Sequence, residues 1–198
     1  MKTPSSSPAR YSALARWFHW LTVLLVGILV PTGIAMVIRS EQKILDSVTD
    51  TLFSTHKLTG FTLLWLVALR LSYRSLFGAP PPDPGLTSWQ RTASRLNHWG
   101  MYALLIILPL LGWLGISMFP ALKLFGLFDL PSIASPNKAA AEVVLDVHMA
   151  LAWVLIALVN LHIAAVVYHT FIRHDGVLRR MLPASWMQAE GDKVTEPS

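Results

Sequence analysis

Four long apolar segments alternate with polar connections along this chain. They cover approximately residues 17–38, 58–73, 99–119 and 143–172, and we expect the second helix to begin near Phe53. The first segment holds about 22 residues, which at about 1.5 Å per residue reach about 33 Å, enough to cross the hydrocarbon core of a bilayer. The pattern therefore predicts an all-α integral membrane four-helix bundle, running up-down-up-down.

The connections have patterns of their own. Residues 78–85 read Gly-Ala-Pro-Pro-Pro-Asp-Pro-Gly, which cannot form a regular helix and predicts a stiff loop. Residues 121–128, Ala-Leu-Lys-Leu-Phe-Gly-Leu-Phe, predict a short amphipathic piece lying on the membrane interface. We expect one transmembrane domain at residues 1–183, a polar tail at 184–198, and no cleavable signal peptide.

The basic residues predict the orientation of the bundle. Of the 16 Lys and Arg, the larger group lies on the side that holds both termini: Lys2, Arg10, Arg16, Arg70, Arg74, Arg91, Arg95, Arg173, Arg179, Arg180 and Lys193. The smaller group lies on the other side: Arg39, Lys43, Lys57, Lys123 and Lys138. Because cytoplasmic loops carry the excess of Lys and Arg, both termini are expected to be cytoplasmic.

Composition narrows the functional classes. The chain is 54% hydrophobic and 14% charged, with a net charge of +5. The basic residues flank apolar segments, so membrane lipid explains them better than nucleic acid, which we do not expect as a partner. There is no cysteine. This excludes disulfides, thiolate metal sites, iron–sulfur clusters and covalently attached c-type haem.

Histidine is the chemistry-bearing residue of the apolar segments. An ionisable side chain inside a membrane span is costly and indicates a function, although one such histidine could simply form a hydrogen bond across the bundle. Six of the seven histidines lie in or beside the apolar segments: His19, His56, His98, His148, His162 and His169. Six in one small chain argue against the purely structural explanation.

The spacing of the histidines predicts two sites at different depths. His148 and His162 are 14 positions apart, about 21 Å along a helix and within about 40° of one face, and His169 lies near that face too. His56 enters the second span level with His148, which pairs these two. His19 lies at the opposite end of the bundle, where both His162 and His169 remain possible partners.

Two pairs at two depths favour planar haem over a simple metal site. Zinc would require three or four ligands at one depth, often with a carboxylate, and the first three spans contain no Asp or Glu. Copper or zinc bound by histidine, as in a cofactor-free metal transporter, is the alternative. Basic residues at the span ends could pair with haem propionates: Arg16, Arg70 and Arg74 on the inner side and Lys57 on the outer side.

Several motifs together resemble the prokaryotic cytochrome b561 family. Residues 10–21 read Arg-Tyr-Ser-Ala-Leu-Ala-Arg-Trp-Phe-His-Trp-Leu, and the likeness continues through His56 with Gly60 and through Asn-His-Trp-Gly-Met-Tyr at 97–102. It ends with Leu-His-Ile-Ala-Ala-Val-Val-Tyr-His at 161–169 and Asp-Gly-Val-Leu-Arg-Arg-Met-Leu-Pro at 175–183. The resemblance covers most of the chain, and the combination of motifs is more specific than any one of them.

The resemblance implies two non-covalent b haems with bis-histidine ligation. It implies His19 with His162 for the inner haem and His56 with His148 for the outer one. His98 and His169 match family positions outside the axial pairs, and we expect them to contact a propionate or to line a quinone pocket near the inner face.

The resemblance also implies a quinone-linked oxidoreductase of the bacterial inner membrane, with ubiquinone as substrate and, in some members, superoxide as the periplasmic electron donor. The acidic residues of the outer connections, such as Asp46 and Asp129, weigh against a funnel for superoxide. The alternative is a haem-bearing anchor that relays electrons for a larger dehydrogenase or hydrogenase complex, with its redox partner outside.

Overall fold

The computed structural model describes residues 10–82 and 85–182, so the expected tail at 184–198 lies outside the described residues. The helices are α1 (Ala13–Glu41), α2 (Ser47–Phe77), α3 (Ser88–Met118) and α4 (Lys138–Phe171). Two short strands, β1 (Lys123–Leu124) and β2 (Phe128–Asp129), and a 3₁₀ helix, η1 (Leu178–Arg180), complete the described elements.

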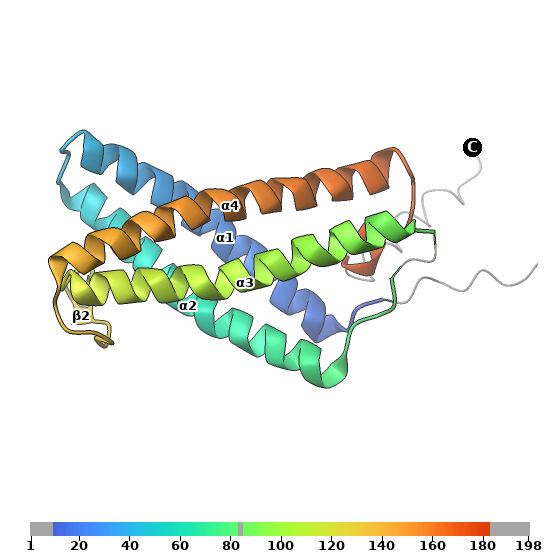
Figure 1. Cartoon of the computed structure of the whole chain (residues 1–198), viewed down its shortest axis with the longest axis horizontal. Helices are drawn as coiled ribbons and strands as arrows, with labels where there is room; N and C mark the ends of the chain where they lie inside the picture. Colours follow the sequence, from blue (N-terminus) through green and yellow to red (C-terminus); the bar gives the residue numbers. More distant parts are fainter. Residues whose placement is uncertain (1–9, 83–84, 183–198) are drawn as a thin grey trace, which may run out of the picture.

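The four helices form two antiparallel hairpins that pack against each other (Figure 1). One hairpin is α1 with α2, the other is α3 with α4, and α2 contacts α3 between them. The α1–α2 turn and the β-strands lie at one end, and the start of α1, the end of α2, the start of α3 and the end of α4 lie at the other (Figure 1). All four helices are long and apolar enough to span a membrane. The predicted four-helix membrane bundle is therefore confirmed.

The helices are longer than the apolar segments because polar side chains continue and cap them. The Asp46 side chain accepts a hydrogen bond from the backbone N–H of Thr49 and begins α2 well before Phe53. The backbone N–H of Thr87 donates to the side chain of Gln90 at the start of α3. Hydropathy measures the part of a helix that contacts lipid, so it underestimates the length of each helix.

The segment at residues 121–128, predicted as a short amphipathic piece, forms an antiparallel hairpin in which Leu124 pairs with Phe128. Phe125 and Gly126 make the turn with φ of 51° and 72°, a left-handed conformation that a helix cannot contain. Leu124 is completely buried, and the Ser54 hydroxyl accepts a hydrogen bond from the backbone N–H of Phe125. Tertiary contacts with α2 therefore select the strand conformation.

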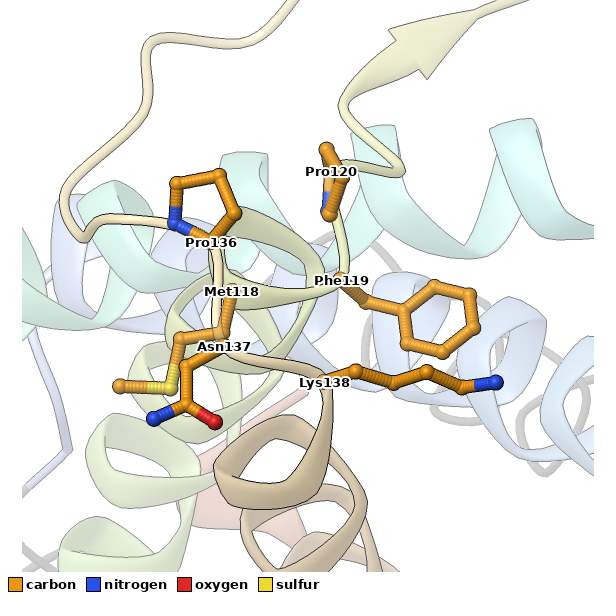
Figure 2. Close-up of a pocket in the computed structure, with 6 residues that line it drawn as sticks. All are labelled: Met118, Phe119, Pro120, Pro136, Asn137 and Lys138. Carbon is orange, nitrogen blue, oxygen red and sulfur yellow. The ribbon is translucent and has the colours of Figure 1, made fainter.

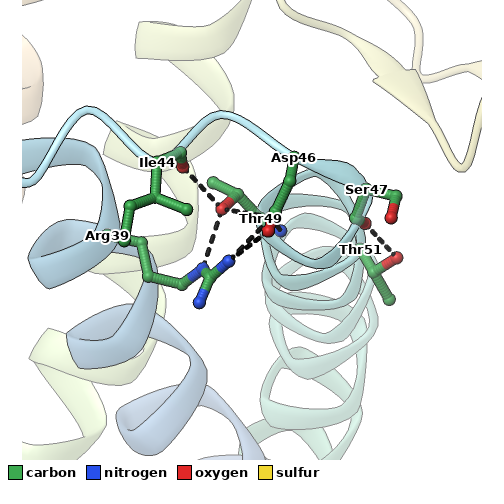
Figure 3. A network of polar contacts seen from close by, with 6 residues as sticks. All are labelled: Arg39, Ile44, Asp46, Ser47, Thr49 and Thr51. Atoms are coloured by element: carbon green, nitrogen blue, oxygen red, sulfur yellow. Dashed lines mark hydrogen bonds and ion pairs between the residues drawn. The ribbon is translucent and has the colours of Figure 1, made fainter.

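A polar network closes the α1–α2 turn (Figure 3). The Arg39 guanidinium contacts both carboxylate oxygens of Asp46, at 2.7 and 2.6 Å, and its Nε donates to the Thr49 hydroxyl at 2.8 Å. The Thr49 hydroxyl in turn donates to the carbonyl of Ile44 at 2.8 Å. The network joins the end of α1 to the beginning of α2.

The segment after α4 returns to the beginning of α1. Arg10 donates to the carbonyl of Leu182 at 2.7 Å, the backbone N–H of Tyr11 donates to the carbonyl of Arg180, and the Trp20 indole donates to the carbonyl of Met181 at 3.0 Å. These contacts link the two ends of the described chain at the inner end of the bundle.

The buried core is an apolar layer in the middle of the bundle. Leu63 and Val67 of α2, Leu105 and Leu108 of α3, and Leu155 of α4 belong to one buried cluster. Leu155 lies midway in sequence between His148 and His162, so the core occupies the level between these two histidines. Large apolar side chains of α1 and α4 face outward, as expected where lipid replaces water.

The outer end carries a shallow hollow of about 340 Å³ between the end of α3 and the start of α4 (Figure 2). The Lys138 ammonium lies 5.8 Å from the centre of the Phe119 ring, and both side chains point to the same side of the hollow (Figure 2). Met118, Pro120, Pro136 and Asn137 complete the lining. None of these residues is a histidine, so the hollow is separate from the candidate site.

Candidate functional site

Two histidines face each other in the outer half of the bundle. The imidazoles of His56 on α2 and His148 on α4 have ring centres 6.4 Å apart and planes inclined by 74°. Both rings are partly buried. The pairing predicted from their matching depth is the one that the helices bring together.

Each outer imidazole is held from behind by a backbone carbonyl. His56 Nδ1 lies 3.1 Å from the carbonyl oxygen of Leu29 on α1, and His148 Nδ1 lies 2.9 Å from that of Leu108 on α3. A carbonyl can only accept a hydrogen bond, so Nδ1 carries the proton in both rings. The Nε2 lone pairs are consequently free to bind a metal.

The inner half holds a second facing pair. His19 on α1 and His162 on α4 have ring centres 6.3 Å apart, with planes inclined by 71°. Nη2 of Arg70 lies 3.3 Å from Nδ1 of His19. The inner pair therefore has a positively charged guanidinium beside it, whereas each imidazole of the outer pair has a backbone carbonyl beside it.

The two candidate partners of His19, which are His162 and His169, have different surroundings. His162 faces His19, whereas His169 Nδ1 contacts a carboxylate oxygen of Asp175 at 2.5 Å. Nε of Arg173 lies 3.5 Å from the same carboxylate oxygen. His169 thus belongs to a separate polar cluster at the inner end.

His98 is a third imidazole at the inner site. Its ring centre lies 5.2 Å from that of His162, and its Nδ1 lies 2.6 Å from the backbone carbonyl of Ser94. The depth argument from sequence did not place His98 against His162, because it sits on a helix that contributes no member of the facing pairs.

The basic residues proposed for propionates contact backbone and aromatic groups in this structure. Arg16 donates to the carbonyl of Tyr11 at 2.7 Å. Lys57 donates to the carbonyls of Ala121 and Lys123 at 3.0 and 2.6 Å, which holds the outer hairpin. Arg70 and Arg74 both lie over the ring of Tyr102, at 5.3 and 5.7 Å from its centre.

Sequence reasoning missed the residues that orient the imidazoles. They are the carbonyls of Leu29 and Leu108, the hydroxyl of Thr32 at 3.3 Å from His56 Nδ1, and two glycines, Gly33 and Gly112, beside the outer rings. A backbone carbonyl leaves no trace in the sequence. The two glycines do appear in the sequence, but they indicate a space for an imidazole only when it is known which helix faces each of them.

The paired geometry fits haem. Two imidazoles that bind one iron from opposite sides have ring centres about 6 Å apart, because each ring centre lies about 3 Å from the metal: about 2 Å for the bond from the ring nitrogen and about 1 Å from that nitrogen to the centre of its ring. Both facing pairs meet this requirement, and the Nδ1 hydrogen bonds of the outer pair are typical of metal-bound histidine. Among the described residues, no three histidine or carboxylate side chains are grouped to hold a metal ion by themselves.

A bundle of four membrane helices with facing histidines defines a class: multi-pass membrane proteins that bind haem between helices and carry electrons. The chain belongs to the prokaryotic cytochrome b561 family, which it matches over residues 10–184. It is accordingly a haem b-binding electron-transfer protein of the inner membrane.

Curated relatives are similar over nearly their whole length. Cytochrome b561 homolog 2 of Escherichia coli (strain K12) is 29% identical over 182 residues, 91% of this chain and 95% of the relative. Cytochrome b561 homolog 1 of the same strain is 28% identical, over 88% of this chain and 97% of the relative. A probable superoxide oxidase, CybB, of Yersinia pestis is 27% identical, over 88% and 96%.

Proposed function

We propose that the chain binds two b haems and passes electrons through them between the outer face of the membrane and quinone at the inner face. The observation that carries the proposal is the pair of imidazole couples, with ring centres 6.4 and 6.3 Å apart. Their members on α4 are separated by 14 positions, about 21 Å along the helix.

The ligands that we propose are His56 with His148 for the outer haem and His19 with His162 for the inner haem. His98 is closer to His162 than His19 is, at 5.2 Å between ring centres, which is shorter than an intervening iron requires. This distance favours His98 as a neighbour of the inner haem, beside Arg70, over His98 as an axial ligand.

The chemistry that bound haem supplies is a reversible one-electron change of iron, and two histidine ligands leave no position open for oxygen. The residues of this chain orient the imidazoles and exclude water from the level between the pairs, where Leu155 and its buried neighbours lie. We propose that Arg16, Arg70 and Arg74 on the inner side and Lys57 on the outer side neutralise propionates.

Reduction of a quinone requires protons as well as electrons. We propose His169 and His98 as the titratable groups beside ubiquinone at the inner face. The contact of His169 with Asp175 supports this role, because a carboxylate on Nδ1 fixes the ring and leaves Nε2 available for a proton. Thus His169 would exchange a proton with the quinone and Asp175 would hold the imidazole.

The name of the relative from Yersinia pestis supports superoxide as the electron donor to be tested first. Lys57 follows His56 in sequence on the outer side, where the carboxylates of Asp50 and Asp129 offset its positive charge. The competing function is an electron relay that anchors a dehydrogenase or hydrogenase, and a third is metal transport without a cofactor.

Visible spectroscopy of the pure protein separates these functions. We expect a Soret band, low-spin b-type bands on reduction, two haems per chain, and reduction by ubiquinol and by superoxide added separately. Haem that ubiquinol fails to reduce, together with co-purification of a dehydrogenase, would identify a relay anchor. A preparation that shows no Soret band after incubation with hemin and removal of the unbound hemin would refute haem binding and favour transport.

A further inference from the structure

The same local arrangement occurs once in each helical hairpin. In the first, the imidazole of His56 on α2 rests against α1 between the carbonyl of Leu29 and Gly33. In the second, the imidazole of His148 on α4 rests against α3 between the carbonyl of Leu108 and Gly112. In both cases the glycine follows the carbonyl by four residues, about one helical turn.

The glycines provide the space in which the imidazoles lie. A Cβ atom on Gly33 would lie 3.0 Å from Cε1 and 3.4 Å from Nδ1 of His56. A Cβ atom on Gly112 would lie 3.3 and 3.5 Å from the same atoms of His148. Any larger residue would push the imidazole away from the carbonyl to which it donates.

The inner pair lacks this arrangement. Among the described residues, neither His19 nor His162 donates to a backbone carbonyl, and His19 Nδ1 instead faces Nη2 of Arg70 at 3.3 Å. With iron held at Nε2 the His19 ring carries its proton on Nδ1, so Arg70 would act on the inner pair through its positive charge and not as a hydrogen-bond donor. The group next to the imidazole is therefore a partially negative carbonyl oxygen in the outer pair and a positively charged guanidinium in the inner pair.

This difference has a direct electronic consequence. An imidazole that donates its Nδ1 proton to a carbonyl becomes a more basic ligand, and a more basic ligand stabilises the ferric state. A guanidinium near the imidazole places positive charge near the iron, which stabilises the ferrous state. Hydrogen bonding and nearby charge are among the factors that set haem potentials.

We infer that Gly33 and Gly112 are positioning residues that let the carbonyls of α1 and α3 hold both outer imidazoles, and that the outer haem consequently has the lower midpoint potential. The inference rests on the proposed ligation. Electrons that enter at the outer face then move to the inner haem energetically downhill, which fits a donor outside and an acceptor inside.

Redox titration of the Gly33→Ala and Gly112→Ala variants tests the inference. We expect the lower of the two midpoint potentials to shift upward and the higher one to stay in place, with the larger shift in Gly33→Ala because its contact is closer. Gly27→Ala is the matched control on α1, since no atom lies within 4 Å of the added Cβ. Gly100→Ala controls for packing alone, because its Cβ meets Leu158 at 3.0 Å.

A gentler variant covers the case in which the alanine variants fail to fold. Thr32→Val removes the hydroxyl 3.3 Å from His56 Nδ1, and we expect a smaller upward shift of the lower potential. Unchanged potentials in the alanine and valine variants would overturn the inference. So would a His148→Ala variant whose remaining haem has the lower potential of the wild-type protein.

A measurement on haem-free protein tests the role of the glycines independently of the proposed function. Nitrogen-15 NMR of labelled histidine reports which ring nitrogen carries the proton. We expect the Nδ1–H form for His56 and His148, and its loss in Gly33→Ala and Gly112→Ala respectively. The Nε2–H form at both positions in the wild type would refute the positioning role, whether or not haem binds. Absence of haem from the purified holoprotein would refute the proposed function instead.

Discussion

The carboxylate of Asp46 is bound by the guanidinium of Arg39 across the α1–α2 turn, with Nη2 to oxygen distances of 2.7 and 2.6 Å. The hydrogen bond from the backbone N–H of Thr49, followed by that from Arg39, lowers the pKa of Asp46 to about 2. Unfolding releases this carboxyl to its ordinary pKa of about 3.9. The structure therefore favours the ionised form.

A pH-dependent contribution to stability follows. Because the pKa is lower in the folded state, the contribution is complete above about pH 4 and is lost as the pH falls toward about 2. We expect Asp46→Asn to lower the thermal unfolding midpoint at pH 7 and to match the wild type near pH 2. Glu41→Gln, which removes a nearby carboxylate outside the network, is the control. An equal loss at both pH values would show that ionisation of Asp46 does not contribute to the stability of the turn.

Substitution of single histidines should separate the two haem sites. We expect His148→Ala to retain the inner haem alone and His162→Ala the outer haem alone, so that each variant loses about half of the haem, as measured by the pyridine haemochrome assay. His174→Ala, beyond the end of α4, should keep full occupancy. If His169→Ala loses a haem while His162→Ala does not, the inner assignment is wrong.

The inner cluster should affect quinone chemistry without affecting haem content. We expect Asp175→Asn and His169→Gln to slow reduction by ubiquinol by about a hundredfold, the lower end of the range for loss of a positioned acid or base. Haem occupancy and reduction by dithionite should stay unchanged. Arg179→Gln, on η1 and outside this cluster, is the control. A normal ubiquinol rate in both variants would exclude the cluster from the quinone site.

The outer hairpin should loosen when its contacts with α2 are removed. Ser54→Ala leaves the partly buried backbone N–H of Phe125 without its acceptor, and the net loss of one hydrogen bond costs about 0.5–1.5 kcal/mol. Lys57→Met removes the donor to Ala121 and Lys123. We expect faster hydrogen exchange at residues 121–130 in both variants and wild-type exchange in Lys43→Met. Unaltered exchange in Ser54→Ala would mean that burial of Leu124 alone holds the hairpin.

The sequence was sufficient to predict the four spans and one of the two facing pairs. Apolar length fixes the spans, and the matching depths of His56 and His148 follow from counting residues along helices. His162 could not be separated from His169 in this way, because both lie near one face of α4. The family resemblance favoured His162, and Asp175 explains the different position of His169, since it binds that imidazole from the segment after α4.

Other features depend on tertiary contacts that sequence patterns do not report. The hairpin at 121–129 is apolar and short, so either a helix or a strand fits its composition. The roles of Gly33 and Gly112 depend on which imidazole lies opposite each glycine. From its position at a span end, Lys57 was expected to reflect membrane topology or to pair with a propionate. Its hydrogen bonds to the outer connection could be recognised only in the three-dimensional structure.

The position of α4 in the chain has a consequence for biogenesis. This helix supplies one imidazole to each facing pair, and the segment that follows it closes onto Arg10, Tyr11 and Trp20. Ribosomes make α4 after α1, α2 and α3, so neither couple exists while these three helices enter the bilayer. We therefore expect cofactor loading to wait until α4 has been made, and a chain truncated before α4 to present no complete binding couple to free haem.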